Sequence, residues 1–224
     1  MGRVYIQEHT TKNPISLIGQ EAGICYGADT TTKEKNFQRG LDCLNSEHGR
    51  TFEFPDVYVT LDGYSARVIR EWYTHIGGAP TRLQASTRYI KYGEFGYIIP
   101  PTIQNSPNGI EAYQSLMESI SQTYRYLEEQ QIPKEDIANI LPLGMTTKVV
   151  CKFNLRFLID MSHQRMCSRA YWEYRELFKD LSTALSNYSL EWSVITSKFL
   201  KPKCEISGFC PEKNSCGRKP KKGE

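Results

Sequence analysis

The sequence lacks the short motifs by which the common nucleotide-binding and hydrolytic enzymes are recognised. It has no P-loop and no G-x-G-x-x-G after a predicted strand, so the usual nucleotide folds are unsupported. It also has no G-x-S-x-G elbow and no H-E-x-x-H, and its four histidines show no metal-ligand spacing. An enzyme with this sequence must therefore hold its cofactor by other means.

Long apolar runs are absent as well. No stretch approaches the roughly 20 apolar residues that cross a bilayer, and the first residues, "MGRVYIQEHTTKNPIS", lack the apolar core of a signal peptide. Ile6 stands where a myristoylation site needs Ser or Thr. We therefore expect a cytoplasmic protein with no membrane partner.

Excess charge of one sign is missing from most of the chain. The net charge is +3, and residues 198–224 hold eight Lys/Arg against three Glu, which gives +5 there and −2 elsewhere. A body of that charge is not a general nucleic-acid binder, and we expect no nucleic-acid partner. With 224 residues, we expect one catalytic domain, 1–198, followed by a basic tail, 199–224.

The seven cysteines form two groups. Cys25, Cys43, Cys151 and Cys167 are scattered, and we expect reduced, packed thiols. The other three recur at intervals of six, and they could be three ligands of a metal site, but a fourth ligand is missing. We expect no metal and a partly ordered tail that contains Cys204, Cys210 and Cys216.

The apolar periodicity favours helices over strands. It predicts helices over 37–49, 64–76, 110–129 and 133–141, and a mostly helical block over 154–185. Alternation predicts strands over 56–61 and after Gly144, with Asp62-Gly63 as a turn, whereas residues 1–30 show no clear element. The expected class is a helix-dominated α+β fold in a single domain.

The segment "WYTHIGGAPTRLQASTRYIKY" ends a predicted helix at Gly77 and then sets polar side chains at every second position. Alternate residues of a strand point to the same face, so this run would project hydrogen-bonding groups into one cleft. We interpret it as a segment that holds a phosphorylated, planar ligand. Its polar side chains are Arg82, Gln84, Ser86 and Arg88.

Five arginines lie in apolar or aromatic segments instead of charge runs, and arginine binds phosphates and planar carbonyl groups well. Arg165 and Arg169 are four residues apart and would share a helical face. The alternative interpretation is surface ion pairing with nearby acids. The arginines are Arg82, Arg88, Arg156, Arg165 and Arg169, and the acids are Asp160, Glu173 and Glu176.

Several short segments, in order, resemble the flavin-dependent thymidylate synthases over roughly residues 20–180. That family's signature is R-H-R-x-x-S-x-N-x-x-S-x-R-Y, followed by L-P-x-x-x-x-T, N-x-R-x-L, an Arg and A-Q-x-E-I-R. His75, Ser86, Arg88 and Tyr89 match the signature. The other matching segments are "AGICY", "HGRTFEF", "LPLGMTTK", "NLRFL", Arg165 and "AYWEYR".

The chain departs from that pattern near His75. Thr74 and Ile76 replace the two flanking arginines, and two extra residues, with a Gly-Gly-Ala-Pro turn, separate His75 from Ser86. The Arg that precedes the L-P segment in the family falls at Ala138. Contacts of the lost arginines would then be supplied by other residues, Arg82 first among them and Arg70 as a further candidate.

The resemblance implies methylation of dUMP by methylenetetrahydrofolate, with a hydride from FAD that NADPH has reduced, in a homotetramer with shared active sites. Arg165 would be catalytic, because a donor to the pyrimidine carbonyl stabilises the charge that develops on the ring. The implied dUMP contacts are Glu71, Gln84, Ser86, Thr87, Arg88 and Arg165. The implied FAD contacts are Cys25, Thr51, Glu53, Thr74, His75, Ile76, Asn154, Arg156, Asp160 and Arg169.

Two alternatives stay open. The same scaffold could hydroxymethylate or otherwise modify a pyrimidine nucleotide, since the signature arginines are altered. The chain could also be a non-catalytic nucleotide- or RNA-binding module that uses its basic tail. The Pro-Cys-His setting of folate-only thymidylate synthases is absent around all seven cysteines, which disfavours a covalent cysteine mechanism.

Overall fold

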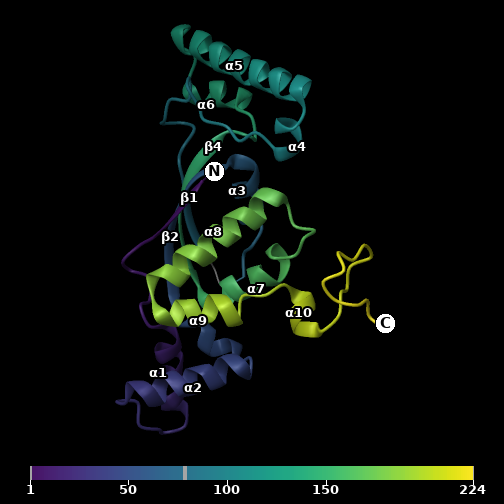
Figure 1. The fold of residues 1–224 in the computed structure, drawn as a ribbon. Coiled ribbons are helices and arrows are strands. Elements are labelled where there is room, and N and C mark those ends of the chain that lie inside the picture. Colours follow the sequence, from purple (N-terminus) through teal and green to yellow (C-terminus); the bar gives the residue numbers. More distant parts are fainter. Residues whose placement is uncertain (1, 78–79, 224) are drawn as a thin grey trace. The chain divides into compact units, whose positions relative to one another are not determined.

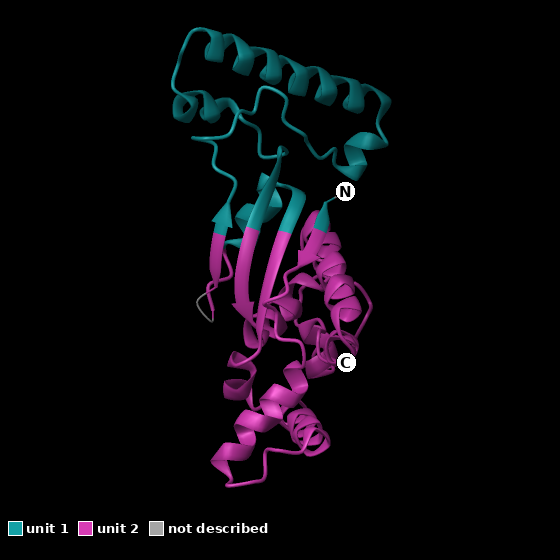
Figure 2. Cartoon of the chain, turned by 90° about the vertical axis from the view of Figure 1, so that its left-hand side faces the viewer, with its two compact units in different colours: residues 1–3, 61–73, 83–149 teal, residues 4–60, 74–82, 150–224 magenta. Residues whose placement is uncertain are grey.

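A computed structural model describes residues 2–77 and 80–223. Gly78 and Ala79, the middle of the expected Gly-Gly-Ala-Pro turn, lie outside the described residues. The chain divides into two compact units (Figure 2): unit 1 holds residues 1–3, 61–73 and 83–149, and unit 2 holds 4–60, 74–82 and 150–224. The class is α+β, as expected from the sequence.

Four strands pair into one antiparallel sheet in the order β1-β2-β4-β3 (Figure 1). Their bounds are Arg3–Ile6 (β1), Asp56–Ser65 (β2), Thr81–Gln84 (β3) and Thr146–Asn154 (β4). Burial alternates along the two long strands: Val57, Val59 and Leu61 are inaccessible in β2 while the residues between them are half-buried. This period of two is what a strand with one covered face requires.

Unit 1 builds its core under one long helix. Ser65 caps α3 by accepting a hydrogen bond from the Val68 N–H at 3.1 Å, and Ser106 caps the long helix α5 in the same way. Tyr124 and Met117 of α5 pack with residues of the preceding loop and of the segment before β4. The helical elements of the unit are α3 (Ala66–Trp72), α4 (Pro101–Gln104), α5 (Pro107–Glu129), α6 (Lys134–Ile137) and the short turn η2 (Ala138–Ile140).

Unit 2 holds the remaining helices. Two of them approach closely at glycines: a Cβ on Gly19 would lie 1.8 Å from the Asn36 carbonyl oxygen, and one on Gly40 would lie 1.9 Å from that of Ile15. Only glycine permits that backbone contact. The elements are α1 (Pro14–Cys25), α2 (Lys33–Asn45), the turn η1 (Gly49–Glu53), α7 (Leu155–Arg165), α8 (Trp172–Tyr188), α9 (Leu190–Lys198) and α10 (Lys203–Ser207).

Three expectations for the elements were wrong. Residues 1–30 are not irregular, because they contain β1 and α1. Asp62-Gly63 is not a turn: Gly63 adopts φ +77°, and β2 continues through it to Ser65. The helix over 64–76 is shorter than predicted and ends at Trp72, five residues before Gly77.

Two expectations about the arginine-bearing segments were also wrong. The strand-like run ends at Gln84, so Ser86 and Arg88 lie in the following turn and do not continue the alternation of Arg82 and Gln84. Helix α7 ends at Arg165, so Arg169 lies beyond it and shares no helical face with Arg165.

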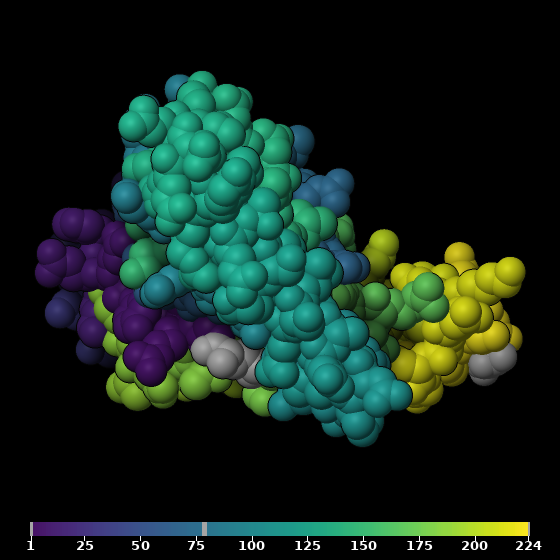
Figure 3. Space-filling view, turned by 90° about the horizontal axis from the view of Figure 1, so that it is seen from above, coloured from purple at the N-terminus to yellow at the C-terminus, as the bar shows by residue number. Residues whose placement is uncertain are grey.

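The C-terminal tail belongs to unit 2 and contributes buried side chains to it. Leu200, Cys204 and Cys210 are buried, and the backbone N–H of Cys210 donates to the Pro220 carbonyl at 2.7 Å. In Figure 3 the residues of this segment lie together as one yellow group on the surface. The expectation of packed thiols holds for Cys43 and Cys151 but is wrong for Cys25, which is exposed.

Among residues 2–77 and 80–223, no helix is both long and apolar enough to cross a membrane. In the same part of the chain, no group of three or more His, Cys, Asp or Glu side chains is arranged to hold a metal ion.

Candidate functional site

The side chain of Arg165 lies at the centre of a cluster in unit 2. Its Nε–H donates to Nε2 of His75 over 2.8 Å, and its Nη2 lies 3.4 Å from the Thr74 hydroxyl oxygen. The guanidinium carbon lies 4.4 Å from the ring centroid of Tyr174, within the range of a cation–π contact. These residues, with Arg82 and Phe157, form the Arg165 cluster. Helix α7 supplies the arginine at its last residue, and α8 supplies the tyrosine.

His75 is a neutral acceptor in this cluster. Burial, and then the positive charges of Arg165 and Arg82, lower the pKa of His75 from 6.5 to about 4. A neutral imidazole has one N–H and one acceptor nitrogen. Since Nε2 accepts from Arg165, the proton sits on Nδ1 at neutral pH.

Arg82 of β3 contacts two residues of the cluster, His75 and Phe157. Its Nη2 donates to the carbonyl oxygen of His75, and its guanidinium lies 5.9 Å from the ring centroid of Phe157. The His75 ring packs edge-on against Phe157 at 6.2 Å and against Tyr174 at 6.0 Å. Two arginines therefore hydrogen-bond to His75, and two aromatic rings pack against its imidazole. This arrangement suits an anionic or carbonyl-bearing ligand.

A second group in unit 2 joins the start of α7 to η1. The side-chain oxygen of Asn154 accepts from the Phe157 N–H at 3.0 Å and so caps α7. Arg156, the second residue of α7, pairs with Glu53 of η1 at 2.6 Å. The hydroxyl of Thr51 donates to the His48 carbonyl at 2.8 Å. A cavity of about 600 Å³ lies beside this group, and Gly49, Phe52, Arg156 and Asp160 line it.

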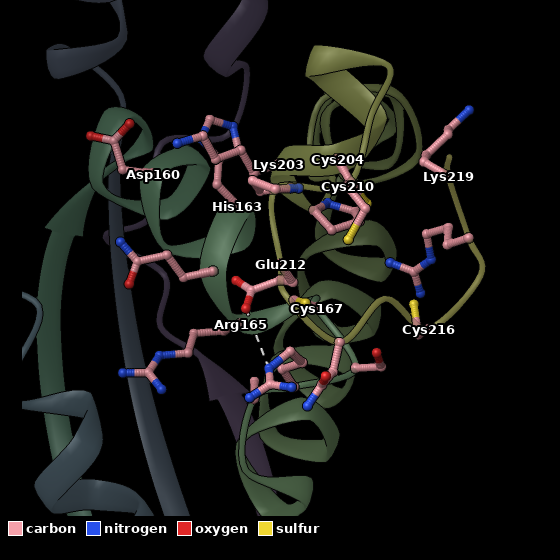
Figure 4. A pocket seen from close by; sticks show the side chains of 18 residues that line it. Asp160, His163, Arg165, Cys167, Lys203, Cys204, Cys210, Glu212, Cys216 and Lys219 are labelled. Atoms are coloured by element: carbon pink, nitrogen blue, oxygen red, sulfur yellow. Dashed lines mark ion pairs between the residues drawn. The ribbon is translucent and has the colours of Figure 1, made fainter. Parts of the chain in front are cut away.

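A larger cavity, of about 900 Å³, lies between the end of α7 and the tail (Figure 4). Arg165 and Asp160 belong to its α7 wall, and the tail provides Cys204, Cys210 and Cys216. Arg169 forms an ion pair at 3.3 Å with Glu212 of the tail, drawn dashed in Figure 4, which is a partner that the sequence did not suggest. A hydrogen bond from Ser168 is the main cause that lowers the pKa of the exposed Cys216 thiol. The predicted residues Asp160, Arg165 and Arg169 thus line one cavity.

Three of the predicted nucleotide residues, Gln84, Ser86 and Arg88, lie in unit 1. The Gln84 amide donates to the Thr147 hydroxyl at 3.3 Å, and the Ser86 hydroxyl accepts from the Arg88 N–H at 3.2 Å. The Ala85 N–H donates to the Lys148 carbonyl, which fixes the start of this turn against β4. The Arg88 side chain is exposed, and its Nε lies 2.9 Å from a carboxylate oxygen of Glu135.

Other predicted residues lie apart from these contacts. Glu71 lies on α3 and Thr87 lies in the turn between Ser86 and Arg88. Cys25 is the last residue of α1 and does not line either cavity, and Ile76 is 77% exposed. Arg70 is exposed on α3.

Sequence reasoning missed three partners of the predicted arginines. Tyr174, Glu135 and Glu212 were not predicted to take part, yet each contacts an arginine that was. A signal existed only for Tyr174, because "AYWEYR" carries an aromatic residue where the family pattern has Ile.

Comparison with known proteins agrees with the motif order. Residues 7–187 match the family Thy1, described as thymidylate synthase complementing protein. A flavin-dependent thymidylate synthase of Pyrococcus horikoshii is 31% identical, covering 95% of this chain and 91% of that protein. Enzymes of the same description from Thermococcus onnurineus and Clostridium tetani are 29% and 26% identical, over 90% and 93% of this chain and 86% and 90% of theirs.

Proposed function

Because the chain belongs to the Thy1 family of flavin-dependent thymidylate synthases, we propose that it methylates dUMP to dTMP. Methylenetetrahydrofolate supplies the one-carbon unit, and NADPH supplies the electrons that reduce the flavin. The observation that carries the proposal is the Arg165 cluster, in which a guanidinium is held by a neutral histidine, a hydroxyl and an aromatic face.

In this proposal Arg165 is the catalytic residue. The C5 carbon of uracil is a weak nucleophile, and negative charge spreads to the ring carbonyl groups as C5 attacks. A guanidinium that donates to a carbonyl stabilises that charge in the transition state. His75 favours this role because its neutral form orients Arg165 without competing for an anion.

The turn after β3 is proposed to bind the nucleotide. Ser86 and Arg88 would hold the phosphate through a hydroxyl and a guanidinium, and Gln84 would contact the base or ribose. Thr87 and Glu71 complete this set in unit 1. Glu135 would have to give up its ion pair with Arg88 when phosphate arrives, which is feasible since both side chains are more than half exposed.

The predicted flavin residues in unit 2 carry side-chain groups that can hydrogen-bond to a flavin. A flavin ring offers two carbonyl oxygens and an imide N–H, and its dinucleotide carries a pyrophosphate. Asn154, Arg156 and His75 provide amide, guanidinium and imidazole groups, with Thr51 and Glu53 beside them. When bound, the flavin supplies the hydride that completes the methyl group. The chain's part is to orient the ring, and Thr74, Ile76, Asp160, Arg169 and Cys25 are proposed as further contacts.

We also propose that the active sites are shared between copies in a homotetramer, as the resemblance implies.

Cysteine chemistry has no part in this mechanism: Cys43 and Cys151 are buried, and the Pro-Cys-His context is absent. We propose a second candidate product on the same scaffold, since the uncharged Thr74 and Ile76 stand in place of two arginines. That product would be a hydroxymethylated pyrimidine nucleotide.

The test is to incubate the purified protein with FAD, NADPH, methylenetetrahydrofolate and dUMP, and to identify the nucleotide product by mass. Thymidylate as the sole product supports the first proposal, and a hydroxymethyl nucleotide supports the second. A flavin absorption band that shifts on addition of dUMP would show that both ligands bind in contact. A protein that neither retains FAD nor consumes dUMP refutes both proposals.

A further inference from the structure

The Tyr174 ring is itself held in a fixed orientation. The side chain is completely buried, and its hydroxyl donates to the sulfur of Met161 at 3.0 Å. Met161 lies one turn before Arg165 on α7, so α7 provides both the guanidinium and the acceptor that orients the ring beneath it. The hydroxyl of Tyr174 is thus held by Met161, while the face of its ring contacts Arg165.

Three contacts orient the Arg165 side chain. A neutral imidazole nitrogen, a hydroxyl oxygen and a π face each attract the guanidinium. The hydrogen bonds engage Nε and Nη2, whereas the ring centroid lies 4.4 Å from the guanidinium carbon. The ring therefore adds a separate contact that restricts the orientation of the guanidinium.

We infer that Tyr174 is a positioning residue for Arg165, and this inference rests on the proposed function. "AYWEYR" carries Tyr174 where the family pattern has Ile, and an aliphatic side chain offers no π face. Thr74 and Ile76 replace the arginines on either side of His75. In this chain the aromatic contact supplies part of the support for Arg165, and it does so through orientation and not through contact with the substrate.

The decisive experiment places phenylalanine, and then phenylalanines with increasing numbers of ring fluorines, at position 174. These side chains have nearly the same shape, so packing is kept while the negative potential of the ring face falls step by step. We expect Tyr174→Phe to keep turnover within about twofold, and the most fluorinated ring to lower kcat by about tenfold. The KM for dUMP should change little, because orientation of a group that acts in the transition state appears in kcat. Turnover that is independent of fluorination would overturn the inference.

A measurement without turnover separates this inference from the proposed function. The Nε–H signal of Arg165 can be observed with ¹⁵N-labelled arginine and assigned by its loss in Arg165→Lys. In the native protein and in Tyr174→Phe we expect slow exchange of this proton with solvent. In Tyr174→Ile we expect exchange at least about tenfold faster. Equal protection in Tyr174→Ile and Tyr174→Phe would refute the positioning role, even in a protein that makes no thymidylate.

Discussion

The Nε of Arg88 lies 2.9 Å from a carboxylate oxygen of Glu135, so an acid of α6 already occupies the arginine proposed to bind phosphate. Both side chains are more than half exposed, and a pair of that kind contributes about 0.2–1 kcal/mol. Glu135→Gln removes the competitor and a charge that repels phosphate. We expect it to tighten dUMP binding by up to about fivefold, measured by calorimetric titration.

The matched control for this substitution is Glu118→Gln. Glu118 pairs with Arg125 at 3.4 Å in the same unit. It should leave dUMP affinity unchanged, while Arg88→Ala should weaken it. If Glu135→Gln binds dUMP no better than the native protein, Arg88 is not the phosphate ligand.

Arg165→Ala removes the proposed stabilisation of charge on the pyrimidine. We expect kcat to fall by at least about a hundredfold, which is the typical effect of deleting one such donor. Arg165→Lys keeps the charge but loses the planar fork and the bond to His75, so it should recover only a part of the rate. Lys179→Ala, an exposed charge on α8, serves as the control and should be neutral. Near-native turnover of a well-folded Arg165→Ala protein would eliminate the mechanism.

Local pattern was sufficient to predict some elements but not others. The apolar period of 110–129 predicted α5 within three residues at its start, because the helix presents one continuous buried stripe. Helix α1 was missed because Gly19 and Gly23 interrupt its pattern, and Gly19 is required there by contact with α2. β2 was cut short at Gly63 because a glycine can end a strand or, as here, lie within one. Local sequence does not distinguish those outcomes.

The candidate site depends on contacts between residues distant in the chain. Arg165 and His75 are 90 residues apart, and Arg156 and Glu53 are 103 apart. Motif order selected these residues in the sequence, but it contained no information on which ones touch. Tyr174, Glu135 and Glu212 are partners that the structure identified.

Asn154 has a structural role that can be separated from its proposed contact with the flavin. Its side-chain oxygen caps α7, and Asn154→Ala should lower the free energy of unfolding by about 1 kcal/mol and the melting temperature by about 2–4 °C. Asn154→Asp keeps a capping oxygen and adds a favourable charge at the helix N-terminus, so its stability should stay near native. If Asn154 also contacts the flavin, the Asp variant should retain less FAD despite that stability. Normal FAD content in Asn154→Asp would confine Asn154 to the capping role.

The protonation of His75 predicts a pH dependence of stability with a definite sign. The pKa of His75 is about 4 in the folded protein and 6.5 when unfolded, so the unfolded state binds more protons between these values. The free energy of unfolding should therefore fall as pH drops from 6.5 towards 4. Histidine NMR titration should place the His75 pKa near 4, and Arg165→Ala should raise it in part, because burial remains the larger cause. A native titration near 6.5 would contradict the neutral acceptor.

The hypothesis of a nucleotide- or RNA-binding module can be tested on the tail. Because part of the tail is buried, substitutions of exposed residues are a better test than deletion. Removing residues 199–224 would strip away the buried Leu200, Cys204 and Cys210 and the bonds between Lys201 and Ser162, so lower stability is expected whatever the function. Substituting the exposed Lys213, Lys221 and Lys222 by Gln removes charge while it keeps those contacts.

For an enzyme whose chemistry lies in the Arg165 cluster, this triple substitution should change dUMP turnover by less than about twofold, because surface changes away from a site have small effects. A module that binds RNA through its tail would instead lose affinity and salt dependence together, since each lost cation removes a phosphate contact. Measuring turnover and RNA binding on the same triple variant therefore decides between the two. Loss of turnover with intact folding would show that the tail's charge serves the reaction itself.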